Sequence, residues 1–325
     1  MSLFPYFFRV VEVTNVGMSV RGVVEGAVAL ALYGVMLALS AYTPLGLFLS
    51  LVLPLPFAVY AARQGWQPSA WAAALALVLT AFLFGLPAVP AAVFAGAVGT
   101  ALGGAHRKRR PAEQAVLLAF LAALVSMLLL LVALAAFFNI NLVERFETLM
   151  RESLQAAERM LERAGMDVER QAAMWHESGR WLHQLIPSML LMSAATVALV
   201  NQWAAGHVLR RMGVPVRRLP PLKDWRLPRS LLYYYLASIV LLFIPGVRDV
   251  TWLANVAWNG QALLSVLFVL QGLSLVFFVA DARGWSPWVG RAVVILLFLF
   301  PHLFLILSLA GIVDLATRVR DVIRR

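Results

Sequence analysis

The chain has no cysteine and few charged residues, and each scarcity excludes a class of protein. Without cysteine there are no disulfides, thiolate nucleophiles or cysteine-ligated metals. Charged residues make up only 13% of the 325 residues, whereas 62% are hydrophobic and the mean hydropathy is +0.83. Such a chain cannot hide its apolar surface in one soluble core. We therefore expect an integral membrane protein with lipid as its solvent.

Catalytic and cofactor signatures are also missing. The sequence contains no HExxH, GxSxG or GxxxxGK[ST] motif and no pair of carboxylates in an apolar setting. Its histidines are dispersed, and the two that lie seven residues apart, His176 and His183, have no third ligand at matching spacing. We predict no enzyme activity, no catalytic residue, no metal site and no bound cofactor.

The basic residues lie mostly in short connectors between apolar runs, although the formal net charge is +11. This distribution is typical of the positive-inside rule and not of a face that binds nucleic acid, so no nucleic-acid partner is predicted. The strongest cluster occupies residues 209–230, which we expect to form a cytoplasmic linker rich in proline. The N-terminus is then cytoplasmic too, and residues 1–22 lack the pattern of a cleaved signal peptide.

Nine apolar runs approach the length of about 20 residues that a helix needs to cross a bilayer core. They cover residues 23–41, 45–62, 70–86, 89–105, 115–138, 188–208, 231–245, 253–280 and 289–312. We therefore predict an all-α fold of about nine transmembrane helices. A six-span unit over residues 1–208 precedes the linker, and a three-span unit over residues 231–325 ends in a basic tail.

The basic tail keeps eight and ten spans as alternatives to nine. Nine crossings place the tail on the side opposite the linker, which the positive-inside rule disfavours. Either the last run bends back at Pro301, or the second run, which contains LVLPLPF, does not cross. A third interpretation is that earlier loops set the orientation and the tail is tolerated outside.

Residues 139–186 form a nearly neutral insertion that we expect on the extracytoplasmic side. Its first part repeats apolar residues at spacings of three and four from Phe146 to Leu161, as in an amphipathic helix, and Gly165 supplies a stop. Asp167 is a suitable N-cap for a second helix. The insertion is interpreted either as a lid over a pocket that opens outward or as a connector lying on the membrane surface.

Two rows of small residues recur at the spacing of a helix face. The fourth run carries Ala91, Ala95, Gly99 and Gly103, and the first run carries Ala27, Ala31, Gly34 and Ala38. Small residues let helix backbones approach closely in lipid. These rows predict either packing within the chain or a docking surface for another membrane subunit.

Few polar residues fall inside the apolar runs, and each is costly in lipid and therefore a functional candidate. They are Glu25, Asn201, Asn259, Gln271 and His302. The structural alternative is that Glu25 pairs with Arg21 and that the amides form hydrogen bonds between helices. Asp314, at the end of the last run, has Arg318 four residues on as a predicted partner.

Short motifs are spread along nearly the whole chain. They are Glu25-Gly26-Ala27, Leu53-Pro54-Leu55-Pro56, Arg63-Gln64-Gly65, Arg210-Arg211-Met212-Gly213, Leu219-Pro220-Pro221, Gln271-Gly272-Leu273 and Gly311-Ile312-Val313-Asp314. Together they resemble the YybS-like family of bacterial polytopic membrane proteins. The resemblance implies a multi-pass protein of a bacterial plasma membrane and assigns no activity.

The first six runs also distantly resemble the substrate-binding subunit of energy-coupling-factor transporters. That resemblance implies a six-helix unit that binds a small solute and docks on a coupling subunit through small residues of its first helix. Our first hypothesis is a solute-binding or transport-related subunit without its own ATPase. The alternative is a non-enzymatic scaffold that recruits envelope proteins. The expected partners are the bilayer, another membrane subunit and a small solute.

Overall fold

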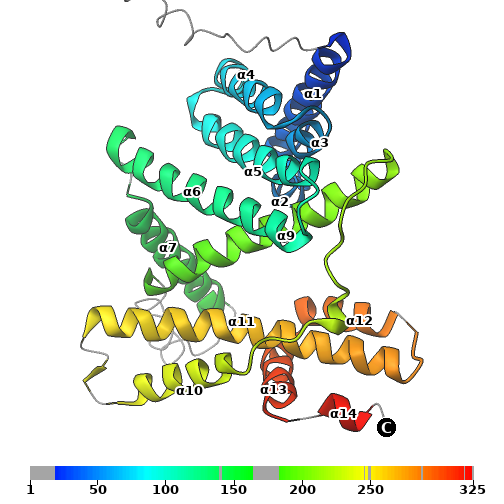
Figure 1. Ribbon diagram of the computed structural model, residues 1–325. Coiled ribbons are helices and arrows are strands. Elements are labelled where there is room, and N and C mark those ends of the chain that lie inside the picture. Colours follow the sequence, from blue (N-terminus) through cyan, green and yellow to red (C-terminus); the bar gives the residue numbers. More distant parts are fainter. Residues whose placement is uncertain are drawn as a thin grey trace, which may run out of the picture. The chain divides into compact units, whose positions relative to one another are not determined.

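The computed structural model describes residues 19–138, 141–163, 183–244, 246–247, 250–286, 288–317 and 319–323, and all regular structure in these ranges is helical (Figure 1). The helices divide into two compact units. Unit 1 comprises Met1–Leu128 and Ala194–Arg218, and unit 2 comprises Leu129–Ser193 and Leu219–Arg325. The linker is therefore shared, because its first half belongs to unit 1 and its second half to unit 2.

Unit 1 is built from five helices, one 3-10 turn and parts of two more helices. They are α1 (Val20–Tyr42), α2 (Gly46–Leu51), α3 (Leu55–Gln64), α4 (Trp66–Phe84), η1 (Leu86–Ala88), α5 (Val89–Arg107), the first part of α6 (Ala112–Phe138) and the second part of α9 (Ile186–Arg211).

Unit 2 takes the remaining parts of α6 and α9 together with the later elements. These are α7 (Leu142–Arg163), η2 (His183–Leu185), η3 (Leu222–Asp224), α10 (Ser230–Phe243), α11 (Thr251–Ala282), α12 (Trp288–Leu299), α13 (His302–Ala316) and α14 (Val319–Ile323).

Six of the described helices are long and apolar enough to cross a membrane, namely α1, α4, α5 with η1, α6, α9 and α11. Shorter apolar helices occupy the other predicted spans, at residues 48–64, 230–243, 288–297 and 302–316. The prediction of an all-α, multi-pass membrane protein is confirmed.

Prolines divide the two predicted runs that the sequence singles out. The second run is interrupted between α2 and α3, and Pro54 precedes the first residue of α3. The last run is interrupted at Phe300 and Pro301, between α12 and α13. Proline lacks an N–H and its ring clashes with the preceding turn, so a helix does not continue through it without a kink.

The segment after α13 returns to the linker. Nη1 of Arg320, in α14, donates a hydrogen bond of 2.8 Å to the carbonyl oxygen of Lys223, in η3. The linker and α14 therefore lie at the same end of unit 2. This geometry agrees with the alternative in which the last run bends back at Pro301.

The small residues of α5 pack inside unit 1. A Cβ atom at Gly99 would lie 2.4 Å from the carbonyl oxygen of Pro54, and one at Gly103 would lie 2.2 Å from that of Ala58. Ala91 is partly buried and Ala95 is fully buried. The α5 row is thus packed against α3 of the same chain. A further small row on α6, at Ala115, Ala119 and Ala123, joins this core with no exposure at all.

The small residues of α1 face outward instead. Ala27 and Ala31 are exposed, Ala38 is partly buried, and no atom lies within 4 Å of a Cβ placed at Gly34. The buried face of α1 is a different one, formed by Gly22, Gly26, Ala29, Tyr33 and Leu37. The two rows share one sequence pattern and have opposite environments.

Helices α11 and α13 of unit 2 cross at two glycines. A Cβ at Gly272 would lie 2.0 Å from the carbonyl oxygen of Leu307, and one at Gly311 would lie 2.0 Å from that of Phe268. Both glycines belong to motifs that carry the family resemblance. Their missing side chains let the two backbones touch.

The first half of the predicted insertion is the observed α7. On its predicted apolar face, Phe146, Met150, Leu154, Ala157 and Leu161 are partly buried. The predicted Gly165 stop, the Asp167 cap, most of the second helix and His176 lie outside the described residues.

Substituting Gly99 and Gly34 separately with alanine tests the packing of the two rows. Gly99→Ala is expected to lower the free energy of unfolding by about 1–3 kcal/mol, because the added methyl meets the α3 backbone. Gly34→Ala is expected to be neutral or to stabilise by up to about 1 kcal/mol, because it meets nothing and favours the helix. Unfolding of the purified protein in mild detergent measures both effects. Equal destabilisation by the two variants would contradict the tight packing at Gly99 and the open space at Gly34.

Candidate functional site

Glu25, on α1, has three partners, of which two belong to α3. Its Oε1 lies 3.1 Å from Nε of Arg21 and 2.6 Å from Nη2 of Arg63, and its Oε2 accepts a hydrogen bond of 2.8 Å from Nε2 of Gln64. The sequence predicted the Arg21 contact, which is local, and missed the two from α3. Arg63 and Gln64 belong to a motif already noted for the family resemblance, but only the fold brings it to α1.

A tyrosine strengthens the same junction. The hydroxyl of Tyr60, on α3, donates to the carbonyl oxygen of Gly22 at 3.1 Å. A Cβ at Gly26 would lie 2.9 Å from that hydroxyl oxygen, so glycine is what admits the ring. The Glu25 cluster is therefore held on two consecutive turns of α1.

An apolar cavity of about 410 Å³ adjoins the Glu25 cluster within unit 1. Residues of α1, α3, the last turn of α9 and the residue after it line it, among them Val28, Leu32, Val59 and Val208. Glu25, Tyr60 and Arg63 are the polar lining residues. Such a volume lies in the range of small-molecule sites, which are mostly apolar with a few polar groups that fix orientation.

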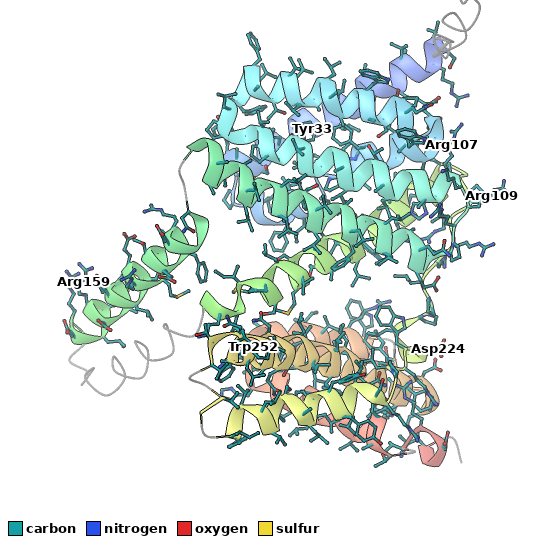
Figure 2. The ribbon with its side chains drawn as sticks, turned by 60° about the vertical axis from the view of Figure 1, so that its left-hand side comes forward. Tyr33, Arg107, Arg109, Arg159, Asp224 and Trp252 are labelled. Carbon is teal, nitrogen blue, oxygen red and sulfur yellow. The ribbon has the colours of Figure 1, made fainter. Side chains whose placement is uncertain are left out.

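Basic side chains gather at the end of unit 1 where Glu25 lies. Arg107, at the end of α5, donates a hydrogen bond to the carbonyl oxygen of Arg63. Figure 2 shows Arg107 and Arg109 together at one end of the unit 1 helices, with Tyr33 further along them. The carboxylates of Glu25 and of Glu113, in the first turn of α6, do not neutralise this end, which therefore carries a positive potential.

Asn201 supplies a hydrogen bond where the second run is broken. It is fully buried on α9, and its Nδ2 donates to the carbonyl oxygen of Leu51 at 2.7 Å and to that of Val197 at 2.9 Å. Leu51 ends α2, so its carbonyl has no helical partner of the usual kind. Asn201 thus satisfies a backbone group that lipid would leave unpaired.

The second polar cluster lies in unit 2 and joins Gln271, Asp314 and Arg320. The side chains of Asp314 and Arg320 are only 3% and 4% exposed and approach to 2.7 Å. Nε2 of Gln271 donates to Oδ2 of Asp314, and Oε1 of Gln271 accepts from the backbone N–H of Leu227 at 3.0 Å. The guanidinium also donates to the carbonyl oxygens of Lys223 and Trp225 and to Ser274 Oγ.

This cluster gives Asp314 a partner that the sequence did not predict. Arg318 lies outside the described residues, and the cation that meets Asp314 is Arg320, six residues on. A second link joins the linker to α11, since Nζ of Lys223 lies 2.8 Å from Oδ2 of Asp281. The hydrogen bond that Lys223 donates to Asp281 raises the pKa of the Lys223 ammonium. The charged groups of unit 2 thus fasten the linker to α11 and α14.

The remaining candidates play different parts. Asn259, on α11, accepts from the backbone N–H of Ser188 at 2.8 Å and donates to the carbonyl oxygen of Gln184 at 2.6 Å, which satisfies the start of α9. His302 is exposed at the first residue of α13. Within the described part of the chain no three His, Asp or Glu residues converge as metal ligands.

Comparison with known proteins gives a family without an assigned activity. A family model described as "Predicted membrane protein (DUF2232)" matches residues 30–315. The "Uncharacterized protein YybS" of Bacillus subtilis (strain 168) is 25% identical over 307 residues, which cover 94% of this chain and 99% of that protein. No solved structure matches the chain.

Removing Arg320 tests how much the buried ion pair with Asp314 contributes to the stability of unit 2. Arg320→Gln is expected to lower the free energy of unfolding by about 3–5 kcal/mol, because it leaves the Asp314 carboxylate buried without its cation. Unfolding in mild detergent measures the loss.

Two further variants control this experiment. Arg21→Gln breaks an ion pair whose arginine is 77% exposed and should cost at most about 1 kcal/mol. The double variant Asp314→Leu with Arg320→Met removes both charges and should recover part of the loss. A single Arg320→Gln variant as stable as Arg21→Gln would refute the role of the pair.

Proposed function

The chain belongs to the DUF2232 family of predicted membrane proteins, and from its structure we propose that it is a non-enzymatic membrane subunit that binds a small amphiphilic solute and takes part in its transport. The cavity beside Glu25 carries this proposal. The cavity has a volume of about 410 Å³, mostly apolar walls and one polar end. This combination matches a solute that has an alkyl or aromatic body and a polar head.

The polar end favours a particular kind of head group. The Glu25 carboxylate already accepts from Arg21, Arg63 and Gln64. Arg63, which retains further N–H donors, is 24% exposed in its side chain. A head group that accepts hydrogen bonds, neutral or anionic, therefore fits better than a cationic one.

The solute has access from the side of the bundle. Val24, Val28 and Leu32 line the cavity and are each more than half exposed on α1. An apolar molecule dissolved in the bilayer meets these side chains directly. Since the sequence has no nucleotide-binding motif, a partner supplies any energy for transport.

The outward row of α1 supports a scaffold as the second candidate function. Ala27 and Ala31 are exposed, and a Cβ placed at Gly34 on the same face would have open space around it. In lipid such a row favours close approach of another helix. Under this alternative the protein recruits a membrane partner through α1 and needs no solute.

Filling the cavity separates these two functions. Native mass spectrometry of the protein purified in mild detergent is expected to show one bound small amphiphile. Val28→Trp, which projects into the cavity, should reduce its occupancy at least about tenfold, as expected for a steric block worth 1.4 kcal/mol or more. Val35→Trp, on the same helix at an exposed position outside the lining, should leave it unchanged.

The result can also favour the scaffold. Co-purification of a protein without any small molecule, lost in Gly34→Leu and kept in Val28→Trp, would replace solute binding with recruitment. Bound amphiphile retained in Val28→Trp would show that the cavity is not its site.

We further propose that the basic end of unit 1, the linker and α14 face the cytoplasm of a bacterial plasma membrane. The absence of cysteine makes the test direct. A membrane-impermeant maleimide should label Tyr42→Cys in intact cells, and Arg217→Cys and Asp321→Cys only after permeabilisation. Labelling of Arg217→Cys and Asp321→Cys from opposite sides would contradict the return of α13 to the linker, and labelling of both from outside would invert the orientation.

A further inference from the structure

Unit 1 has a second hollow, on the face formed by α4, α5 and α6. These three helices follow one another side by side in both views (Figures 1 and 2). The groove has a volume of about 520 Å³ and shares no lining residue with the cavity beside Glu25. Its wall consists mainly of small residues, among them Ala70, Ala73, Gly96, Ala97 and Gly104.

The wall of the groove offers nothing to a polar solute. The hydroxyl of Thr100 lies in it, but that hydroxyl is already hydrogen-bonded to Ser69 Oγ at 2.8 Å. Apart from Trp66, Lys108 and Arg110 at one end, the other lining residues are alanine, glycine and Leu118. An alkyl chain can lie there without leaving a polar group unpaired.

One end of the groove is basic. Lys108 follows the last residue of α5, Arg110 precedes α6, and Arg109 between them turns the chain with a φ of 50°. Lys108 and Arg110 are exposed, and neither forms an ion pair with another residue that the structure describes. By contrast, the neighbouring Arg107 is bound to the Arg63 carbonyl. The groove therefore ends at two cations that pair with no carboxylate of the described residues, Glu113 in the first turn of α6 included.

An aromatic residue marks the same end as the interface with water. Trp66 lines the groove, is 55% exposed, and its Cβ lies 3.5 Å from the position of a Cβ on Gly104. Tryptophan prefers the level of the lipid head groups. The cations thus lie at head-group depth, and the small residues continue from them toward the apolar core.

We propose that this groove binds one anionic phospholipid, with an acyl chain against α5 and the phosphate at Lys108 and Arg110. Basic pockets at the ends of transmembrane helices select anionic lipids in this way. A helix of a partner subunit fits less well, because a helix is about 10–12 Å across and two turns of it exceed the volume of the groove.

Native mass spectrometry of the full chain in mild detergent, titrated with phosphatidylglycerol or phosphatidylcholine, tests the proposal. One phosphatidylglycerol is expected to bind at least about tenfold more tightly than phosphatidylcholine. Lys108→Gln with Arg110→Gln should weaken phosphatidylglycerol about 30-fold, the loss expected for two cations at a lipid surface. Ala97→Trp, which fills the groove, should abolish this site.

Matched variants keep the test specific. Arg109→Gln with Arg211→Gln removes two exposed charges that do not line the groove, and Val93→Trp adds the same ring to α5 outside it; both should bind as the unchanged protein does. Val28→Trp should also leave this lipid bound, so failure of the solute proposal would not affect it.

Several results would overturn the lipid site. They are equal affinity for the two lipids, equal losses in the two double charge variants, unchanged binding in Ala97→Trp, displacement by inorganic phosphate alone at the same concentration, or a co-purifying membrane protein that excludes the lipid and is itself excluded by Ala97→Trp.

Discussion

The fold depends on backbones that approach one another closely, because lipid tails are as apolar as leucine and do not drive helices together. In unit 1 this contact occurs where Gly99 and Gly103 of α5 meet the carbonyls of α3. In unit 2 it occurs where Gly272 of α11 meets Gly311 of α13. Dispersion between atoms in contact replaces the hydrophobic drive, and a methyl group at any of these positions would separate the helices.

The second constraint is that polar groups inside lipid must find partners within the protein. Several buried side chains provide such partners at the places where helices are broken or end. Asn201 reaches Leu51 beside the interruption of the second run, and Asn259 reaches the start of α9. Arg320 donates hydrogen bonds to two carbonyl oxygens and one hydroxyl oxygen, besides pairing with the carboxylate of Asp314. Each of the two proposed binding sites of unit 1 has apolar walls and charged side chains at one end.

Much of this architecture was predictable from the sequence. The lengths of the apolar runs gave the helices within a few residues, because about 20 apolar residues and their polar borders define a span. Pro54 and Pro301 marked the two interruptions for a local reason, the missing N–H. The amphipathic pattern of α7 is equally local.

What the sequence did not give is which groups meet. Glu25 has a local partner in Arg21 and a distant one in Arg63, and only the packing of α1 on α3 selects the second. Asp314 meets Arg320 because the chain turns after α13, which no helical spacing predicts. The rows on α1 and α5 have the same pattern, and lipid and protein interior are too similar in polarity for the sequence to tell an outward row from a buried one. The tail of unit 2 also has a consequence for biosynthesis. Arg320 leaves the ribosome after every group to which it donates a hydrogen bond, namely Lys223, Trp225, Ser274 and Asp314. The polar cluster that joins the linker, α11, α13 and α14 can therefore close only after α14 has emerged.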